Sequence, residues 1–311
     1  MGRSTRIVTA VVLTGLVSWG GLVVAGPAFA DDPGGSVPSA TTPEPSVTTP
    51  EPTVTTPSPT ETTPSPTPTP SATTPSPTPT PPKPKPARVS KSYVLGKTVT
   101  GRKIMAHYRG WKNIRTKRVL VVLGQMHGNE KGGLHTIAWL RQHAKPTLGN
   151  ALWIVPTMNP DGNARGTRRN ARGVDLNRNW PTSGWTGKNR GSGTWGGPSR
   201  ASERETRIIK SFLAKHKPDY IASLHQPFGV VVKNGRYRPF ERRLARGLNM
   251  PLRTVGVGTP SNKVSPTLTG WYNRYYKRYG TATTIEYRAK VTASWARGRA
   301  AKAILNAALI R

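Results

Sequence analysis

The sequence predicts an α/β protein, a three-layer α/β/α sandwich around a mixed, mostly parallel central sheet. Short apolar runs rich in β-branched residues alternate with segments of helical periodicity, which is the pattern of three-layer α/β domains. Histidine and carboxylate residues directly follow several of these runs. All of these features lie in residues 88–311, which we expect to form one folded domain.

The first 30 residues have the pattern of a secretory signal peptide. Arg3 and Arg6 precede an uncharged run over residues 7–30, and the run ends on the small residues of Ala-Phe-Ala at 28–30. A membrane anchor is the alternative, because the run is long enough to span a bilayer. Polar residues, glycines and a proline interrupt the run, and they favour cleavage before Asp31. We therefore expect a secreted, extracellular protein.

Residues 31–87 consist almost wholly of Pro, Thr, Ser and Glu in near-repeats. Such a segment has almost nothing to bury, so we expect a disordered linker with polyproline character. It could be a wall-spanning stalk with O-linked sugars or a solubilising spacer. A stalk must be held at both ends, and cleavage of the signal peptide frees one end, so we favour the spacer.

The absence of cysteine excludes disulfides, thiol catalysis and a lipoprotein anchor. A domain above roughly 200 residues can bury enough apolar surface without disulfides. Of the 47 basic and 13 acidic residues, 43 and 8 lie in residues 88–311, so this part carries a charge of +35. A secreted domain of this charge is expected to associate with an anionic cell wall, an acidic polysaccharide or a membrane surface rather than with nucleic acid.

So few acids in a basic domain are candidates for specific roles. The eight are Glu130, Asp161, Asp175, Glu203, Glu205, Asp219, Glu241 and Glu286.

Strands and helices are expected to alternate after a polar stretch of short strands and turns at 88–117. The expected strands cover residues 118–124, 151–156, 219–225, 230–232 and 281–287. The expected helices cover residues 133–140, 203–213, 238–249, 267–280 and 294–310, and Ser202 is expected to cap the second of these. Glu203 and Glu205 then fall in a first helical turn, where carboxylates complement the helix dipole.

Three strand ends carry the candidate metal site. His127 and Glu130 follow the first strand, His225 ends the third and Glu286 lies at the end of the last. Parallel strands bring such residues to one edge of an α/β sheet. Two imidazoles and a carboxylate are the ligands of a catalytic zinc site, and a further carboxylate suits a general base. Each signal alone is weak, because His225 could be a core histidine and Glu286 a structural ion-pair partner.

A second feature is the segment 159–181, which contains five arginines and the block Asp-Leu-Asn-Arg-Asn. Guanidinium groups capture carboxylates and oxyanions through paired hydrogen bonds. The segment is therefore interpreted as a substrate clamp. A wall- or nucleic-acid-binding face is the alternative, and it suits Arg165, Arg169 and Arg172, whose spacing matches no motif.

Together the motifs HGNE, NPDG, an arginine ahead of GVDLNRNW, SLH and TTIEY resemble the zinc carboxypeptidases of the carboxypeptidase A/B type. The resemblance covers residues 115–310 and implies a zinc carboxypeptidase-like catalytic domain at 88–311. It implies that His127, Glu130 and His225 bind one zinc ion. It also implies that Glu286 acts as general base on the zinc-activated water.

The same resemblance assigns the clamp. Arg168 matches the arginine that steadies the oxyanion, and Asn177 with Arg178 matches the pair that binds the free C-terminal carboxylate of a peptide. The sequence departs from the family where a tyrosine is expected, because Asn262 stands there. We therefore assign no catalytic tyrosine. Gln226, next to His225, receives no role.

The compact motif layout resembles the murein peptide amidase branch. We therefore expect hydrolysis of a cell-wall peptide at the γ-D-glutamyl–meso-diaminopimelate bond, with electrostatic association with the wall. One alternative is a general carboxypeptidase acting on protein C-termini. The residues expected to line the side-chain pocket, 267–270, offer neither a large apolar wall nor an acid. A second alternative is a wall- or polyanion-binding module without activity.

Overall fold

The computed structural model describes residues 83–233, 238–256, 259 and 262–310. The predicted signal peptide and the predicted linker before residue 83 lie outside the described residues. Among those described, no helix is long and apolar enough to cross a membrane.

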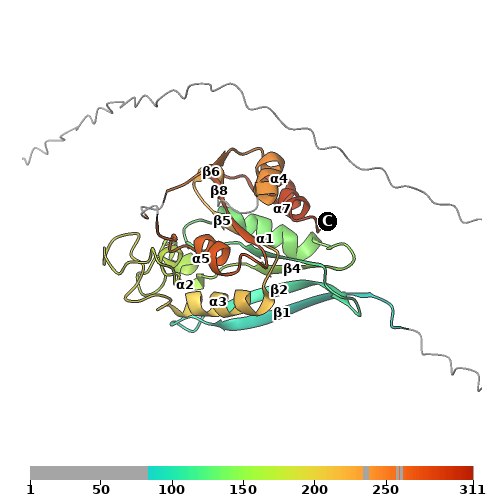
Figure 1. Ribbon diagram of the computed structural model, residues 1–311, viewed down its shortest axis with the longest axis horizontal. Helices are drawn as coiled ribbons and strands as arrows, with labels where there is room; N and C mark the ends of the chain where they lie inside the picture. The colour runs from blue at the N-terminus through green and yellow to red at the C-terminus, as the bar shows by residue number, and fades with distance from the viewer. Residues whose placement is uncertain (1–82, 234–237, 257–258, 260–261, 311) are drawn as a thin grey trace, which may run out of the picture. The chain divides into compact units, whose positions relative to one another are not determined.

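One eight-stranded sheet forms the centre of the described chain (Figure 1). Its strands are β1 (Ala87–Lys97), β2 (Lys103–Lys112), β3 (Arg118–Leu123), β4 (Asn150–Val155), β5 (Tyr220–His225), β6 (Phe228–Val232), β7 (Leu252–Arg253) and β8 (Thr281–Arg288). The order is β1-β2-β4-β3-β5-β8-β6-β7. The four central strands, β4, β3, β5 and β8, run parallel, whereas β1, β2 and β6 pair antiparallel. The predicted mixed sheet is confirmed.

Helices cover both faces of the sheet. They are α1 (Gly132–His143), α2 (Pro160–Arg165), α3 (Arg204–His216), α4 (Arg238–Leu248), α5 (Leu268–Tyr275), α6 (Ala293–Trp295) and α7 (Ala301–Ala307), with a 3₁₀ turn η1 (Leu176–Arg178) and a π-helical turn η2 (Ala296–Ala300). Apolar residues of α1, α4 and α7 pack on one face, and those of α3 and α5 pack on the other.

Strand alternation decides which face each catalytic candidate occupies. On β5, Leu224 joins the core under α1, α4 and α7, so His225 points to the α3 and α5 side. On β8, Ile285 joins the first core, so Glu286 points to the same side as His225. His225 and Glu286 are paired in register on adjacent parallel strands. Neighbouring strands lie about 4.8 Å apart, so the two side chains start as neighbours.

Two local predictions were wrong. The stretch 88–117 forms two long antiparallel strands, β1 and β2, rather than short strands and turns. β1 is an exposed edge strand, so it lacks the apolar run that marks a buried one. Glu203 rather than Ser202 occupies the N-cap position of α3, without a capping hydrogen bond from its side chain, and the Ser202 hydroxyl donates to the Glu203 carboxylate at 2.7 Å.

The loop after β3 packs backbone to backbone on α2, and this contact places the metal-ligand candidates. A Cβ atom added to Gly128 would lie 1.9 Å from the carbonyl carbon of Gly162, so only glycine fits. Asn159 begins α2 by accepting a hydrogen bond from the Gly162 N–H at 2.8 Å. The HGNE and NPDG motifs are therefore two halves of one contact.

Candidate metal centre

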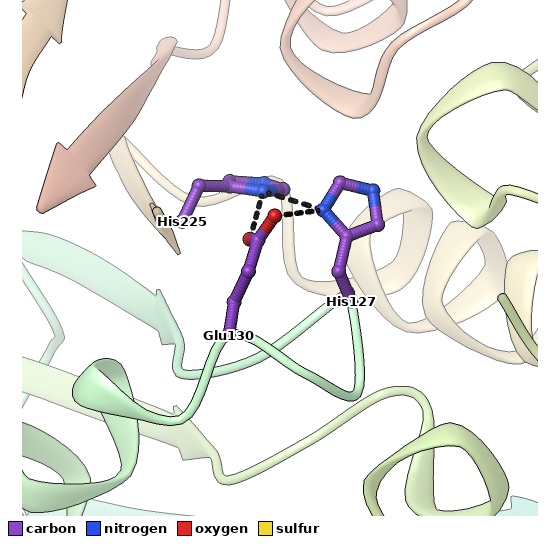
Figure 2. A group of neighbouring side chains, drawn as sticks. All are labelled: His127, Glu130 and His225. Atoms are coloured by element: carbon purple, nitrogen blue, oxygen red, sulfur yellow. Dashed lines mark hydrogen bonds and ion pairs between the residues drawn. The ribbon is translucent and has the colours of Figure 1, made fainter. Parts of the chain in front are cut away.

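His127, Glu130 and His225 converge at the carboxyl ends of β3 and β5 (Figure 2). Figure 2 shows the Glu130 carboxylate between the two imidazole rings. Its Oε1 lies 2.7 Å from His127 Nδ1 and its Oε2 lies 3.1 Å from His225 Nδ1. The two Nδ1 atoms are 3.3 Å apart. All three side chains are buried.

This donor set fits a zinc ion. One atom from each of the three residues lies within 4.8 Å of the others, and two imidazoles with one carboxylate leave further coordination positions free. The opposite ring nitrogens are occupied, since His127 Nε2 contacts Asp175 Oδ1 at 3.0 Å and His225 Nε2 contacts Ser223 Oγ at 3.1 Å. Such contacts orient each ring so that its remaining nitrogen faces the metal.

Asp175 joins the metal site to the clamp. Its Oδ2 accepts hydrogen bonds from Arg168 Nη2 at 2.8 Å and Arg168 Nε at 3.2 Å. Its Oδ1, besides meeting His127, accepts from the Asn177 N–H at 2.8 Å. Arg168 Nη1 in turn lies 3.4 Å from Glu130 Oε1. The carboxylate is fully buried, so each of these contacts is shielded from water.

The electrostatics of the group keep Glu130 charged and favour a proton on His127 that a metal ion would have to displace. Burial alone would raise the pKa of the Glu130 carboxyl, but hydrogen bonds to His127 and His225 outweigh it and lower this pKa to about 2. Burial would lower the pKa of His127, but hydrogen bonds to Asp175 and Glu130 outweigh it and raise this pKa. Glu130 is therefore ionised near neutral pH, as a ligand must be.

Glu286 is the carboxylate of the site without a partner. It is 8% exposed, and its Oε2 is buried with no hydrogen bond within the described chain. Burial raises the pKa of its carboxyl, the nearby His225 opposes this rise and Glu130 adds to it. A carboxylate with a raised pKa and a free oxygen has the properties of a general base.

The segment around Arg168 is held by buried amides. Asn170 Oδ1 accepts from the N–H groups of Arg172 and Val174, both at 3.0 Å. Its Nδ2 donates to Glu203 Oε2 at 2.8 Å, so Glu203 anchors this loop and does more than complement a helix dipole. Asn179 Nδ2 donates to the carbonyl oxygen of Gly196 at 2.7 Å.

Six of the seven residues singled out from the sequence line a cavity of about 580 Å³. The seventh, His225, contacts Glu130 at the metal end of this cavity. Asn177 and Arg178 line its wall on η1. Asn177 Oδ1 accepts from the Leu268 N–H at 3.2 Å, which ties this wall to the start of α5. No tyrosine lines the cavity within the described residues.

The end of the cavity beside α5 is polar. A chain of hydroxyl groups runs along it, with Ser265 Oγ 3.3 Å from Thr267 Oγ1, Thr267 Oγ1 3.3 Å from Thr269 Oγ1, and Thr269 Oγ1 3.5 Å from Thr284 Oγ1. Arg274, exposed on α5, adds a cation. Glu130 and Glu286 are the only carboxylates among the described lining residues.

Asp175 and Gln226 have contacts that the sequence did not predict. The Gln226 N–H donates to Glu130 Oε2 at 3.2 Å, and its Oε1 accepts from the Gly132 N–H at 2.8 Å. Its Nε2 donates to the carbonyl oxygens of Arg288 and Ala289. Two signals pointed to Asp175, its place in the GVDLNRNW motif and the scarcity of acids, whereas no signal pointed to Gln226.

Comparisons with known proteins identify the family of the chain. The family model described as zinc carboxypeptidase matches residues 84–301. Murein peptide amidase A of Escherichia coli K12 is 29% identical over 154 residues, which cover 46% of this chain and 63% of that protein. The carboxypeptidase N catalytic chain of Rattus norvegicus is 27% identical over 227 residues, 60% of this chain and 47% of that one. The chain thus spans less than two thirds of these relatives.

Solved structures share the fold. Murein-tripeptide amidase MpaA from Escherichia coli O157 superposes with a TM-score of 0.56 at 21% identity, covering 72% of this chain and 94% of that one. Carboxypeptidase A from Helicoverpa armigera superposes with a TM-score of 0.57 at 19% identity, covering 71% and 68%. The family match over residues 84–301 covers well over half of the sequence. The chain belongs to the zinc carboxypeptidase family.

Proposed function

We propose that the protein is a zinc-dependent metallocarboxypeptidase that hydrolyses a peptide or amide bond next to a free C-terminal carboxylate. His127, Glu130 and His225 hold the metal. A zinc ion bound there supplies a Lewis acid for the scissile carbonyl and makes water more acidic. The observation that carries the proposal is Glu286, a buried carboxylate with a free oxygen in the same cavity as this ligand set.

Each remaining residue has one task. Arg178 and Asn177 bind the terminal carboxylate of the substrate, which fixes the bond to be cut relative to the metal ligands. Glu286 takes the proton of the attacking water and passes it to the leaving amine. Arg168 stabilises the oxyanion, and Asp175 holds its guanidinium by two hydrogen bonds.

A cell-wall peptide is the proposed substrate, cut at the γ-D-glutamyl–meso-diaminopimelate bond. Relatives named murein peptide amidase A support this choice. The polar end of the cavity supports it too, because diaminopimelate carries a second amine and carboxylate at the end of its side chain. Hydroxyl groups can meet both of these, and Arg274 can pair with the carboxylate. We also propose that the protein is secreted and that its positive charge associates it with the anionic cell wall.

A general carboxypeptidase is the second candidate, favoured by relatives such as carboxypeptidase N. The test is to incubate the purified protein, with zinc and with a chelator, on a wall tripeptide and on N-blocked dipeptides. Zinc-dependent release of diaminopimelate is expected, and preferential cleavage of the dipeptides would favour the second candidate. Hydrolysis of neither substrate would overturn the enzyme proposal and leave a wall-binding module.

The matched control is Glu286→Gln, which keeps the shape of the side chain and removes its charge. We expect it to retain zinc and lose activity by a factor of about 10²–10⁴. Wild-type turnover by this variant would show that another group is the base.

A further inference from the structure

Three surface hollows continue from the catalytic cavity toward α4 and α7. Their volumes are about 490, 350 and 600 Å³, within the range of roughly 300–1,000 Å³ typical of ligand pockets. We name as the cationic track the six exposed basic residues that line them. These are Lys131, Arg246, Arg288, Lys290, Arg299 and Lys302.

The catalytic cavity and the three hollows adjoin one another, because neighbours share lining residues. Gln226 lines both the catalytic cavity and the first hollow. Lys290 lines both the first and the second, and Arg299 lines both the second and the third. Since Gln226 also donates its backbone N–H to Glu130, the track begins directly beside the metal ligands.

The charge along the track is uncompensated. No carboxylate lines any of the three hollows within the described residues. Within the described chain, the ion pairs made by arginine or lysine involve Arg102, Arg168 and Arg172, and none of the track residues. The sequence shows the same bias, because no acid follows Glu286 in the last 25 residues. A groove lined by one sign of charge concentrates its counter-ions.

We propose that the cationic track binds a linear anionic polymer of the cell wall with a phosphate in each repeat, and so holds the enzyme at its substrate. This occupant rests on the proposed function, which places the enzyme on peptides of the cell wall. Three of the six residues are arginines, whose planar guanidinium groups bind phosphate through paired hydrogen bonds. Half-buried Trp295 adds an apolar ring to the second hollow, which suits the carbon backbone of a polyol.

The test compares two triple variants with the same loss of charge. The track variant is K290Q/R299Q/K302Q, and the control is K91Q/K97Q/K215Q, whose exposed lysines lie on β1 and α3. Binding of labelled poly(glycerol phosphate) is measured by fluorescence anisotropy over a range of salt concentrations. The track variant should bind roughly 10- to 100-fold more weakly, with a salt dependence reduced by about three ions. The control should stay within about twofold of the wild type, because distant exposed charges are screened.

Two results would overturn the assignment. Equal losses in both variants would mean that net charge alone causes binding. Tighter binding of single-stranded DNA of equal charge, through the same residues, would identify nucleic acid as the occupant.

A separate measurement distinguishes this inference from the proposed function. On a soluble wall tripeptide the track variant should match the wild type, because none of its three residues lines the catalytic cavity. On intact cell walls its rate should fall, and an unchanged rate there would overturn the holding role. A wild type that cleaves neither substrate would refute the proposed activity, while polymer binding would still report on the track.

Discussion

Replacing Asp175 with asparagine should weaken the metal site and the clamp together. The carboxylate accepts hydrogen bonds from His127, Arg168 and the Asn177 N–H, at distances between 2.8 and 3.2 Å. Burial would raise its pKa, but His127 and Arg168 outweigh burial and hold that pKa well below its usual range. The group is therefore ionised near neutral pH, and the substitution removes a charge.

The size of the effect follows from the geometry. Asparagine has the shape of aspartate, but one of its two oxygens becomes an NH₂ donor. If the NH₂ group faces Arg168, it meets two N–H donors of the guanidinium. If it faces His127, it meets the N–H donors of the imidazole and of the Asn177 backbone. Hydrogen bonds to charged groups contribute about 1.5–3 kcal/mol each. Loss of the partner that orients a metal ligand typically lowers metal affinity 10- to 100-fold.

Zinc affinity is measured by competition with a chromophoric chelator, and kcat and KM are measured on the wall tripeptide. We expect zinc affinity to fall about 10- to 100-fold, and kcat/KM at saturating zinc to fall further because Arg168 loses its orientation. The control is Asp219→Asn, whose carboxylate accepts from the Val119 N–H at 2.7 Å on the amino-terminal side of β3. Its zinc affinity should remain that of the wild type. Zinc affinity and kcat/KM within about twofold of wild type in Asp175→Asn would refute the coupling.

Three further predictions concern the fold, the metal and specificity. Gly128→Ala should destabilise the protein by about 1–3 kcal/mol or more, since its methyl group would strike the Gly162 backbone; an unchanged midpoint of urea unfolding would contradict this. Below the raised pKa of His127, zinc affinity should fall by about tenfold per pH unit, because zinc must displace a proton from the imidazole. Above this pKa the imidazole is neutral and no proton competes with zinc. A zinc titration between about pH 8 and 5 measures the effect, and constant affinity would be the contrary result. Arg274→Glu should shift substrate preference by about 1–2 kcal/mol, away from side chains with an anionic end and toward C-terminal lysine or arginine. The control is Arg278→Glu, which lies outside the cavity. Equal substrate preferences in the two variants would exclude Arg274 from recognition.

The strands that carry the site were predictable because buried parallel strands are apolar along their whole length. β3, β5 and β8 begin and end within two residues of their expected positions, and each leads directly to a chemically distinctive side chain. The hairpin of β1 and β2 was not predictable in this way. One face of β1 is exposed, so its polar residues resemble those of a loop.

Contacts between distant residues limited what the sequence could predict about the site. Asp175 meets His127 across 48 positions, and Gln226 meets Gly132 across 94. Asp175 lies inside the GVDLNRNW motif, but nothing in that motif shows which distant side chain its carboxylate meets, and Gln226 belongs to no motif. Their roles depend on which backbone groups the fold brings beside them. The metal ligands differ because they belong to an ordered set of motifs, HGNE and SLH among them, that follow predicted strands.

The connection between the clamp and α5 limits where specificity can reside. The Asn177 backbone N–H donates to Asp175, and its Oδ1 accepts from the first N–H of α5. One residue therefore connects the metal site to the α5 wall of the cavity. Thr267 then caps α5 by accepting from the Gly270 N–H at 3.0 Å. The hydroxyl groups and Arg274 are thereby held at a set distance from the site of the terminal carboxylate. Changes in α5 side chains should therefore alter which residue is released and leave metal affinity unaffected.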